Sequence, residues 1–76
     1  LALLTTLTKY SLMKDLLNQI ETLTTSFMKD ASSQLDKGNK AAGLRARRAS
    51  LDLEPLLKRF RKLSLEVSAS GKSQDN

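Results

Sequence analysis

The sequence predicts an all-α fold, a helical hairpin with coiled-coil-type packing. Apolar residues recur at steps of three and four in two separate stretches, as they do on one face of a helix. The pair Gly38-Asn39 lies between the stretches, and these residue types commonly end one helix and begin the next. A chain of 76 residues buries only about 60% of its unfolded surface. We therefore expect a second copy to complete the fold, as a dimeric four-helix bundle or an antiparallel coiled coil.

The first predicted helix covers residues 13–37. Its apolar stripe consists of Met13, Leu16, Leu17, Ile20, Leu23, Phe27, Ala31 and Leu35. The opposite face carries charges of both signs, which is typical of a solvated surface, and we assign it no role. Residues 1–12 are interpreted as an N-terminal extension that is dispensable for function, either flexible or an extra helical turn or two.

The predicted turn consists of Gly38 and Asn39. Glycine adopts the left-handed conformation that ends many helices, and the Asn39 side chain is suited to cap the helix that follows. The alternative is one continuous helix that tolerates Gly38 at a cost of about 1 kcal/mol.

The second predicted helix covers residues 40–67 and has the more regular pattern. Its packing seam consists of Ala42, Ala46, Ala49, Leu53, Leu56, Phe60, Leu63 and Val67, close to the a/d spacing of a coiled coil. The alanines come first and the larger residues later, which predicts a wedge-shaped interface with the closest helix approach near the turn. Residues 68–76 are polar and small, and we expect a disordered tail.

Pro55 lies inside this second helix. Proline removes one backbone hydrogen bond and crowds the preceding turn, so either a kink or a break between two helices is expected. The seam continues in phase from Leu53 to Leu56, which favours a kinked helix.

The positive charge of the chain is concentrated in one block. Nine of the 13 Lys and Arg residues lie between Lys37 and Lys62, with only Asp52 and Glu54 among them, so the block carries +7. The flanking segments each sum to −1, and the whole chain carries +5. A basic block of this kind indicates a polyanionic partner.

The composition excludes several other classes of protein. The chain has no Cys and no His, so disulfides are excluded, a structural zinc site is not expected, and a reducing, intracellular setting fits. No run approaches the roughly 18 apolar residues of a membrane span. No nucleophile-base pair or carboxylate cluster is present, so we expect no enzyme, no cofactor and no small-molecule substrate.

Helical phase decides how the basic block is interpreted. At 100° per residue, the seven residues Lys40, Arg47, Arg48, Lys58, Arg59, Arg61 and Lys62 lie opposite the seam, and Arg45 lies near its edge. Solvation alone would explain many such faces. This one is nearly free of acidic residues, and Arg outnumbers Lys five to four in the block, which favours phosphate binding. Lys40 to Lys62 would span about 33 Å, close to one turn of B-form DNA.

Two short motifs in the block are rejected. The spacing of Gly38 and Gly43 matches a phosphate-binding loop, but Leu44 and Arg45 stand where Lys and Ser or Thr are required. The run Arg47-Arg48-Ala49-Ser50 resembles a basophilic kinase site, which we interpret as a chance occurrence.

The stretch Asp36 to Glu66 resembles the bacterial linker-histone-like family of chlamydial type. The resemblance runs from about Met13 to Val67 and is most specific in Lys37-Gly38-Asn39-Lys40-Ala41-Ala42, then at Arg45, Arg47, Ser50 and Leu53, and in the group from Phe60 to Ser64. It implies a nucleoid-associated protein that binds DNA without sequence preference and compacts it. The chain departs from the chlamydial pattern at Pro55 and in having no long basic tail after Val67.

We therefore predict non-sequence-specific binding of double-stranded DNA by a cytoplasmic, nucleoid-associated homodimer. The residues expected at phosphates are Lys37, Lys40, Arg45, Arg47, Arg48, Lys58, Arg59, Arg61 and Lys62. The chief alternative is a coiled-coil protein interaction module whose charge serves solubility or binding to an anionic surface. Leu44, Leu51 and Leu65 beside the basic residues also leave binding to anionic lipid open.

Overall fold

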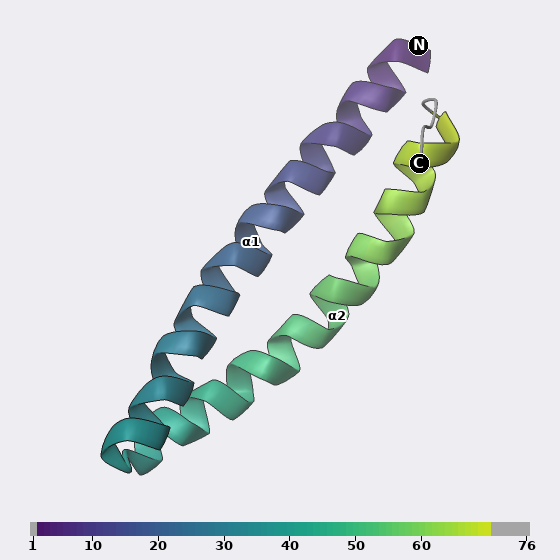
Figure 1. Ribbon diagram of the computed structural model, residues 1–76. Coiled ribbons are helices and arrows are strands. Elements are labelled where there is room, and N and C mark those ends of the chain that lie inside the picture. Colours follow the sequence, from purple (N-terminus) through teal and green to yellow (C-terminus); the bar gives the residue numbers. More distant parts are fainter. Residues whose placement is uncertain (1, 71–76) are drawn as a thin grey trace.

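The computed structural model describes residues 2–70, which form two long helices packed side by side as a hairpin (Figure 1). Helix α1 covers Ala2–Lys37 and helix α2 covers Lys40–Ser70. The two helices give an elongated shape with extents of 52 × 24 × 14 Å. The predicted all-α hairpin is confirmed.

Both helices are longer than the sequence analysis predicted. Helix α1 begins at Ala2 instead of residue 13, because residues 2–12 contain neither Gly nor Pro to stop it. Residues 1–12 were expected to be either flexible or an extra helical turn or two. Residues 2–12 are helical in the structure and form about three turns. Helix α2 continues to Ser70, so the expected start of a disordered tail at residue 68 is wrong. The next helix breaker in the sequence is Gly71. Residues 71–76 of the expected tail lie outside the described residues.

The turn between the helices uses the two residues that the sequence pointed to. Gly38 has a φ of +65°, the left-handed conformation that glycine adopts without strain, and its backbone N–H donates to the Gln34 carbonyl oxygen at 2.9 Å. Asn39 Oδ1 accepts a hydrogen bond from the Ala42 backbone N–H at 3.0 Å, which is the geometry of a helix N-cap. The alternative of one continuous helix is therefore wrong.

The seam of α2 faces α1. Ala42, Ala46, Ala49 and Leu56 are buried, and Leu53, Phe60, Leu63 and Val67 are half-buried. Ala42 is fully inaccessible to solvent, and the neighbouring Gly43 is also buried. In Figure 1 the helices lie closest near the turn, are farthest apart around the middle of the hairpin and come closer again toward the chain ends. The close approach near the turn is as the small residues predicted, but the helices do not open continuously from there as a simple wedge would.

The stripe of α1 is only partly in the interface. Leu16 is almost fully buried, and Met13, Ile20, Leu23, Phe27 and Ala31 are half-buried. Leu17 and Leu35, both assigned to the same stripe, are exposed, Leu35 by 84%. Successive steps of four advance 40° around a helix each time, so Leu35 has rotated away from α2. The apolar arc of α1 is therefore wider than the face that α2 covers.

Pro55 lies inside α2 and does not end it. The side chain is exposed, so the helix tolerates the proline on its outer side. The ribbon in Figure 1 curves through the middle of α2, the part that contains Pro55. The sequence analysis favoured one helix through Pro55 over two separate helices, and the structure has one helix.

Across residues 2–70, neither helix has a segment that is both long enough and apolar enough to span a bilayer.

Replacing Ala46 with leucine should destabilise the hairpin. Ala46 is 4% exposed at the close approach of the helices, so a larger side chain forces them apart at a cost of about 1–3 kcal/mol. Urea denaturation followed by circular dichroism measures this change. Ala41→Leu is the matched control, because Ala41 is exposed on the same helix. Equal stability of the two variants would contradict the packing described.

Candidate nucleic-acid interface

All nine basic residues predicted to bind phosphate are exposed. They are Lys37, Lys40, Arg45, Arg47, Arg48, Lys58, Arg59, Arg61 and Lys62. Eight of them belong to α2, and Lys37 is the last residue of α1. Because the seam of α2 packs on α1, most residues opposite the seam point away from the hairpin, whereas Arg59 and Lys62 line the edge of a groove between the helices. The basic surface is therefore a consequence of the same pattern that builds the core.

The basic surface consists of two clusters. The turn cluster contains Lys37, Lys40, Arg47 and Arg48, and the distal cluster contains Lys58, Arg59, Arg61 and Lys62. Residues 49–57 between them include no Lys or Arg but do include the exposed Asp52 and Glu54. At about 1.5 Å per residue, Arg48 and Lys58 are about 15 Å apart along the helix axis. We call this stretch, residues 49–57, the acidic window.

Arg45 is placed differently from the other eight basic residues. Its Nε and Nη2 atoms donate to Asp30 Oδ1 on α1 at 3.3 and 3.2 Å, and the pair is a salt bridge between the helices. The Asp30 side chain is only 13% exposed, whereas that of Arg45 is 56% exposed. The guanidinium therefore closes one edge of the interface over a partly buried carboxylate. This position agrees with the helical phase that put Arg45 at the edge of the seam.

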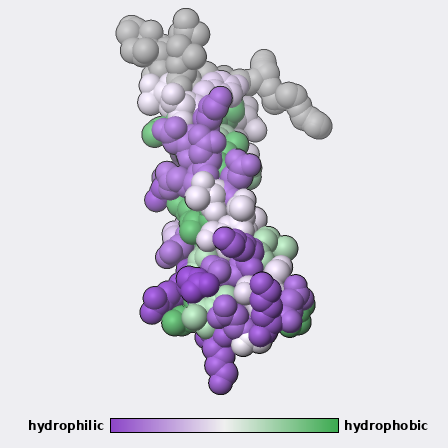
Figure 2. Space-filling view, turned by 90° about the vertical axis from the view of Figure 1, so that its left-hand side faces the viewer, coloured by the Kyte–Doolittle hydropathy of each residue, from purple (hydrophilic) through white to green (hydrophobic). Residues whose placement is uncertain are grey.

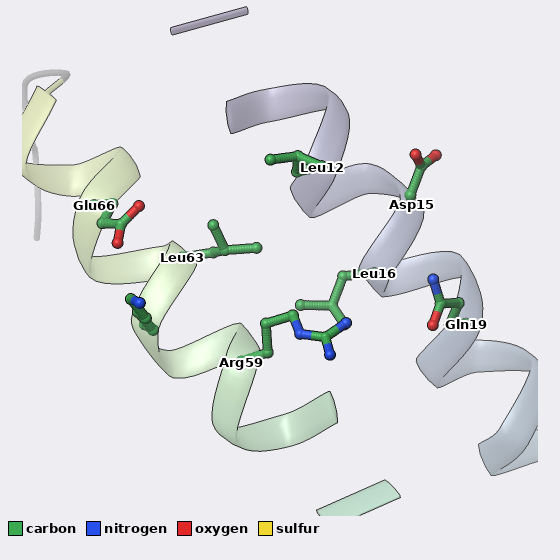
Figure 3. A pocket seen from close by; sticks show the side chains of 8 residues that line it. Leu12, Asp15, Leu16, Gln19, Arg59, Leu63 and Glu66 are labelled. Atoms are coloured by element: carbon green, nitrogen blue, oxygen red, sulfur yellow. The ribbon is translucent and has the colours of Figure 1, made fainter. Parts of the chain in front are cut away.

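The distal cluster borders an open groove between the helices. The groove has a volume of about 430 Å³ and is lined by Leu12, Asp15, Leu16, Gln19, Arg59, Lys62, Leu63 and Glu66. Figure 3 shows Leu12, Leu16 and Leu63 pointing toward one another across it, and Arg59 extending from α2 toward α1. Two basic and two acidic side chains share the rim. Their charges balance, so the groove is not a pocket for a small anion.

The surface is polar but not uniformly so. In Figure 2, hydrophilic side chains cover most of the face shown and are densest toward the turn end of the hairpin, with apolar side chains among them. Three leucines, Leu44, Leu51 and Leu65, are exposed on the outer side of α2 beside the basic residues. They interrupt the basic face without forming a continuous apolar stripe.

No cluster of side chains suited to hold a metal ion is found among the described residues. The sequence has no His and no Cys, and within residues 2–70 no three acidic side chains gather as a metal site would require. The Ser50 hydroxyl donates to the Arg47 carbonyl oxygen at 2.8 Å, which ties it to its own helix. What the site can do is present positive charge on a helix.

Sequence reasoning missed the structural role of Asp30, which lay on a face given no function. A signal was present, because Asp30 and Arg45 lie at similar distances on either side of Gly38 and a hairpin brings such positions together. The packing role of Gly43 was also not identified from the sequence. A Cβ atom added at Gly43 would lie only 2.5–2.7 Å from Gln34 side-chain atoms. A buried glycine beside three alanines indicated close approach, but the residue was weighed only as part of a phosphate loop.

Comparison with known protein families gives a match over most of the chain. Residues 14–70 match the family model described as Histone H1-like protein Hc1. Neither the curated proteins nor the solved structures contain a significant match. The matched range contains the turn, both clusters and the whole seam.

Replacing Arg45 with alanine should lower the stability of the hairpin by about 1 kcal/mol, because the partly buried Asp30 loses its partner. Arg47→Ala is the matched control, since Arg47 is exposed and no acidic group of the described chain forms a salt bridge with it. Thermal unfolding followed by circular dichroism compares the two variants. A larger loss in the Arg47 variant would contradict the role given to Arg45.

Proposed function

Since the chain belongs to the family of Histone H1-like protein Hc1, we propose that it binds double-stranded DNA without sequence preference and compacts the chromosome as a nucleoid-associated protein. Membership in this family implies DNA binding and chromatin compaction, and the family is not one of enzymes. Contact with the phosphate backbone as the mode of binding, and location in the nucleoid, are parts of the proposal.

One observation carries the proposal, namely the eight basic side chains of the two clusters. All eight are exposed, and none of them forms a salt bridge with an acidic residue in the described part of the chain. Each can therefore replace a counterion at a DNA phosphate without first breaking an ion pair. Opposite charges do lie four residues apart at Arg48 and Asp52, Glu54 and Lys58, and Lys62 and Glu66, but none of these pairs forms a salt bridge in the described part of the chain.

Backbone contact is favoured over the reading of bases. Sequence recognition commonly uses Asn, Gln or Arg side chains held at the groove edge by a compact recognition motif. The outer face of α2 carries no Asn or Gln and has several flexible lysines. Stacking on single strands is also unsupported, because Tyr10, Phe27 and Phe60 are the only aromatic residues and Phe60 lies in the interface.

In this proposal Arg45 stabilises the hairpin and does not contact DNA directly. Its guanidinium already donates to Asp30, so a phosphate would have to compete with that carboxylate. The eight residues of the two clusters are the better candidates for direct contact.

A second copy of the chain would pack on α1. Tyr10, Leu17, Met28 and Leu35 are all exposed and fall within about 20° of one another around that helix. The seam of α2 is already covered by α1, so the dimer uses this second stripe. Residues 1–36 sum to −1, whereas two basic blocks of +7 would repel each other. Packing through α1 also leaves both basic faces outside, where two duplexes can be bridged.

DNA affinity should fall steeply with salt and should not depend on the sequence of the duplex. Each phosphate contact contributes a slope of about −0.9 to log K against log salt, so several contacts give a slope of about −4 or steeper. Gel shifts on unrelated duplexes over a salt series measure it. The charge reversal Arg47→Glu with Arg48→Glu should abolish binding while circular dichroism stays helical. Affinity that is independent of salt would contradict the proposal.

The double change Leu17→Lys with Met28→Lys should convert a dimer to a monomer, because it puts charge into the apolar stripe of α1. Sedimentation equilibrium gives the mass of each form. Leu51→Lys is the control, since it also replaces an exposed apolar residue but on α2, and it should remain dimeric. A wild-type chain that sediments as a monomer would overturn the proposed dimer and leave DNA binding untouched.

A further inference from the structure

Apart from Lys37, the last residue of α1, the two basic clusters and the acidic window lie on one continuous helix, which fixes their spacing. Helix α2 runs from Lys40 to Ser70 without a break, so the gap between the clusters is set by helical rise and not by a flexible linker. Arg48 and Lys58 border the gap, about 15 Å apart along the axis. The ligand must therefore present negative charge in two places separated by about that distance.

The acidic window disfavours contact with a phosphate group of the ligand. Asp52 and Glu54 are exposed there, and neither forms a salt bridge within the described part of the chain. Exposed Leu51 and Pro55 add no positive charge between them. Asp52 and Glu54 are two residues apart, so they project from different sides of the helix, and the uncharged Leu51 and Pro55 lie opposite the seam. A phosphate opposite this stretch would meet no cation and at most one carboxylate, so negative charge of the ligand is disfavoured there.

From this spacing we infer that α2 lies across the major groove of B-form DNA, with the turn cluster on the phosphates of one strand, the distal cluster on those of the other, and the acidic window over the groove. The major groove is about 12 Å wide and the minor groove about 6 Å, so the gap of about 15 Å fits the wider one. This inference rests on the proposed DNA binding and specifies its geometry.

The arrangement selects for duplex DNA. A single strand carries phosphates continuously along its length, and a helix lying along it would hold the stretch without cations, with Leu51 and Pro55 outermost, against some of them. Double-stranded RNA has a narrow, deep major groove, so the two clusters would not match its flanking strands in the same way. The helix length, the two clusters and the stretch without cations between them all favour the B-form duplex.

Three exposed leucines on the outer side of α2 make a matched test. Leu44 lies inside the turn cluster, Leu51 lies in the window, and Leu65 adjoins the distal cluster, with exposures of 43%, 63% and 72%. Replacing each leucine with lysine adds the same charge and removes the same side chain. The salt dependence of binding to one mixed-sequence duplex is measured for the wild type and for each variant, with circular dichroism as the check on folding.

Leu44→Lys and Leu65→Lys should each steepen the slope of log K against log salt by up to about 0.9, the value for one added phosphate contact. Leu51→Lys should steepen it by less than half as much, because it faces the groove. Equal steepening by all three variants, or none by Leu44→Lys and Leu65→Lys, would overturn this geometry while leaving DNA binding established. A wild-type chain that fails to bind the duplex would instead overturn the proposed function itself.

Discussion

The close approach of the two helices beside the turn is the constraint on which the rest of the structure depends. Ala42, Ala46 and Ala49 are buried there, and the Gln34 side-chain amide of α1 lies directly over Gly43, where a Cβ atom would displace it. Small residues at these positions let the helices come together, and Asn39 caps the second helix so that it starts in register. Once this face of α2 is turned inward, the basic face can only point outward.

The division of charge between the helices follows from the same constraint. Helix α2 carries eight basic and three acidic residues, so two copies of it repel each other. Helix α1 carries four basic and four acidic residues, so two copies can pack through α1 with less repulsion. The hairpin core is thin, with Leu16 and Leu56 as its only large buried side chains among the described residues. A polyanion that binds the folded form relieves the repulsion along α2 and stabilises the hairpin by mass action.

Much of this fold could be predicted from the sequence because it depends on local signals. The Gly38-Asn39 turn, the seam from Ala42 to Val67 and the exposure of the basic residues all follow from helical phase and capping. The length of α1 could not be predicted, since residues 2–12 lack both a strong apolar pattern and a helix breaker. The exposed Leu35 was misassigned because steps of four drift around a helix. The pairing of Asp30 with Arg45 required the hairpin register, which no single helix specifies.

The most direct test of the account is to map the DNA contact surface on the intact chain by NMR, with chemical-shift changes followed residue by residue as a short duplex is added. The account predicts changes along the outer face of α2 in the turn and distal clusters, with the buried seam residues unaffected. Changes centred on the outer face of α1, or loss of the seam signals as the hairpin opens, would contradict it.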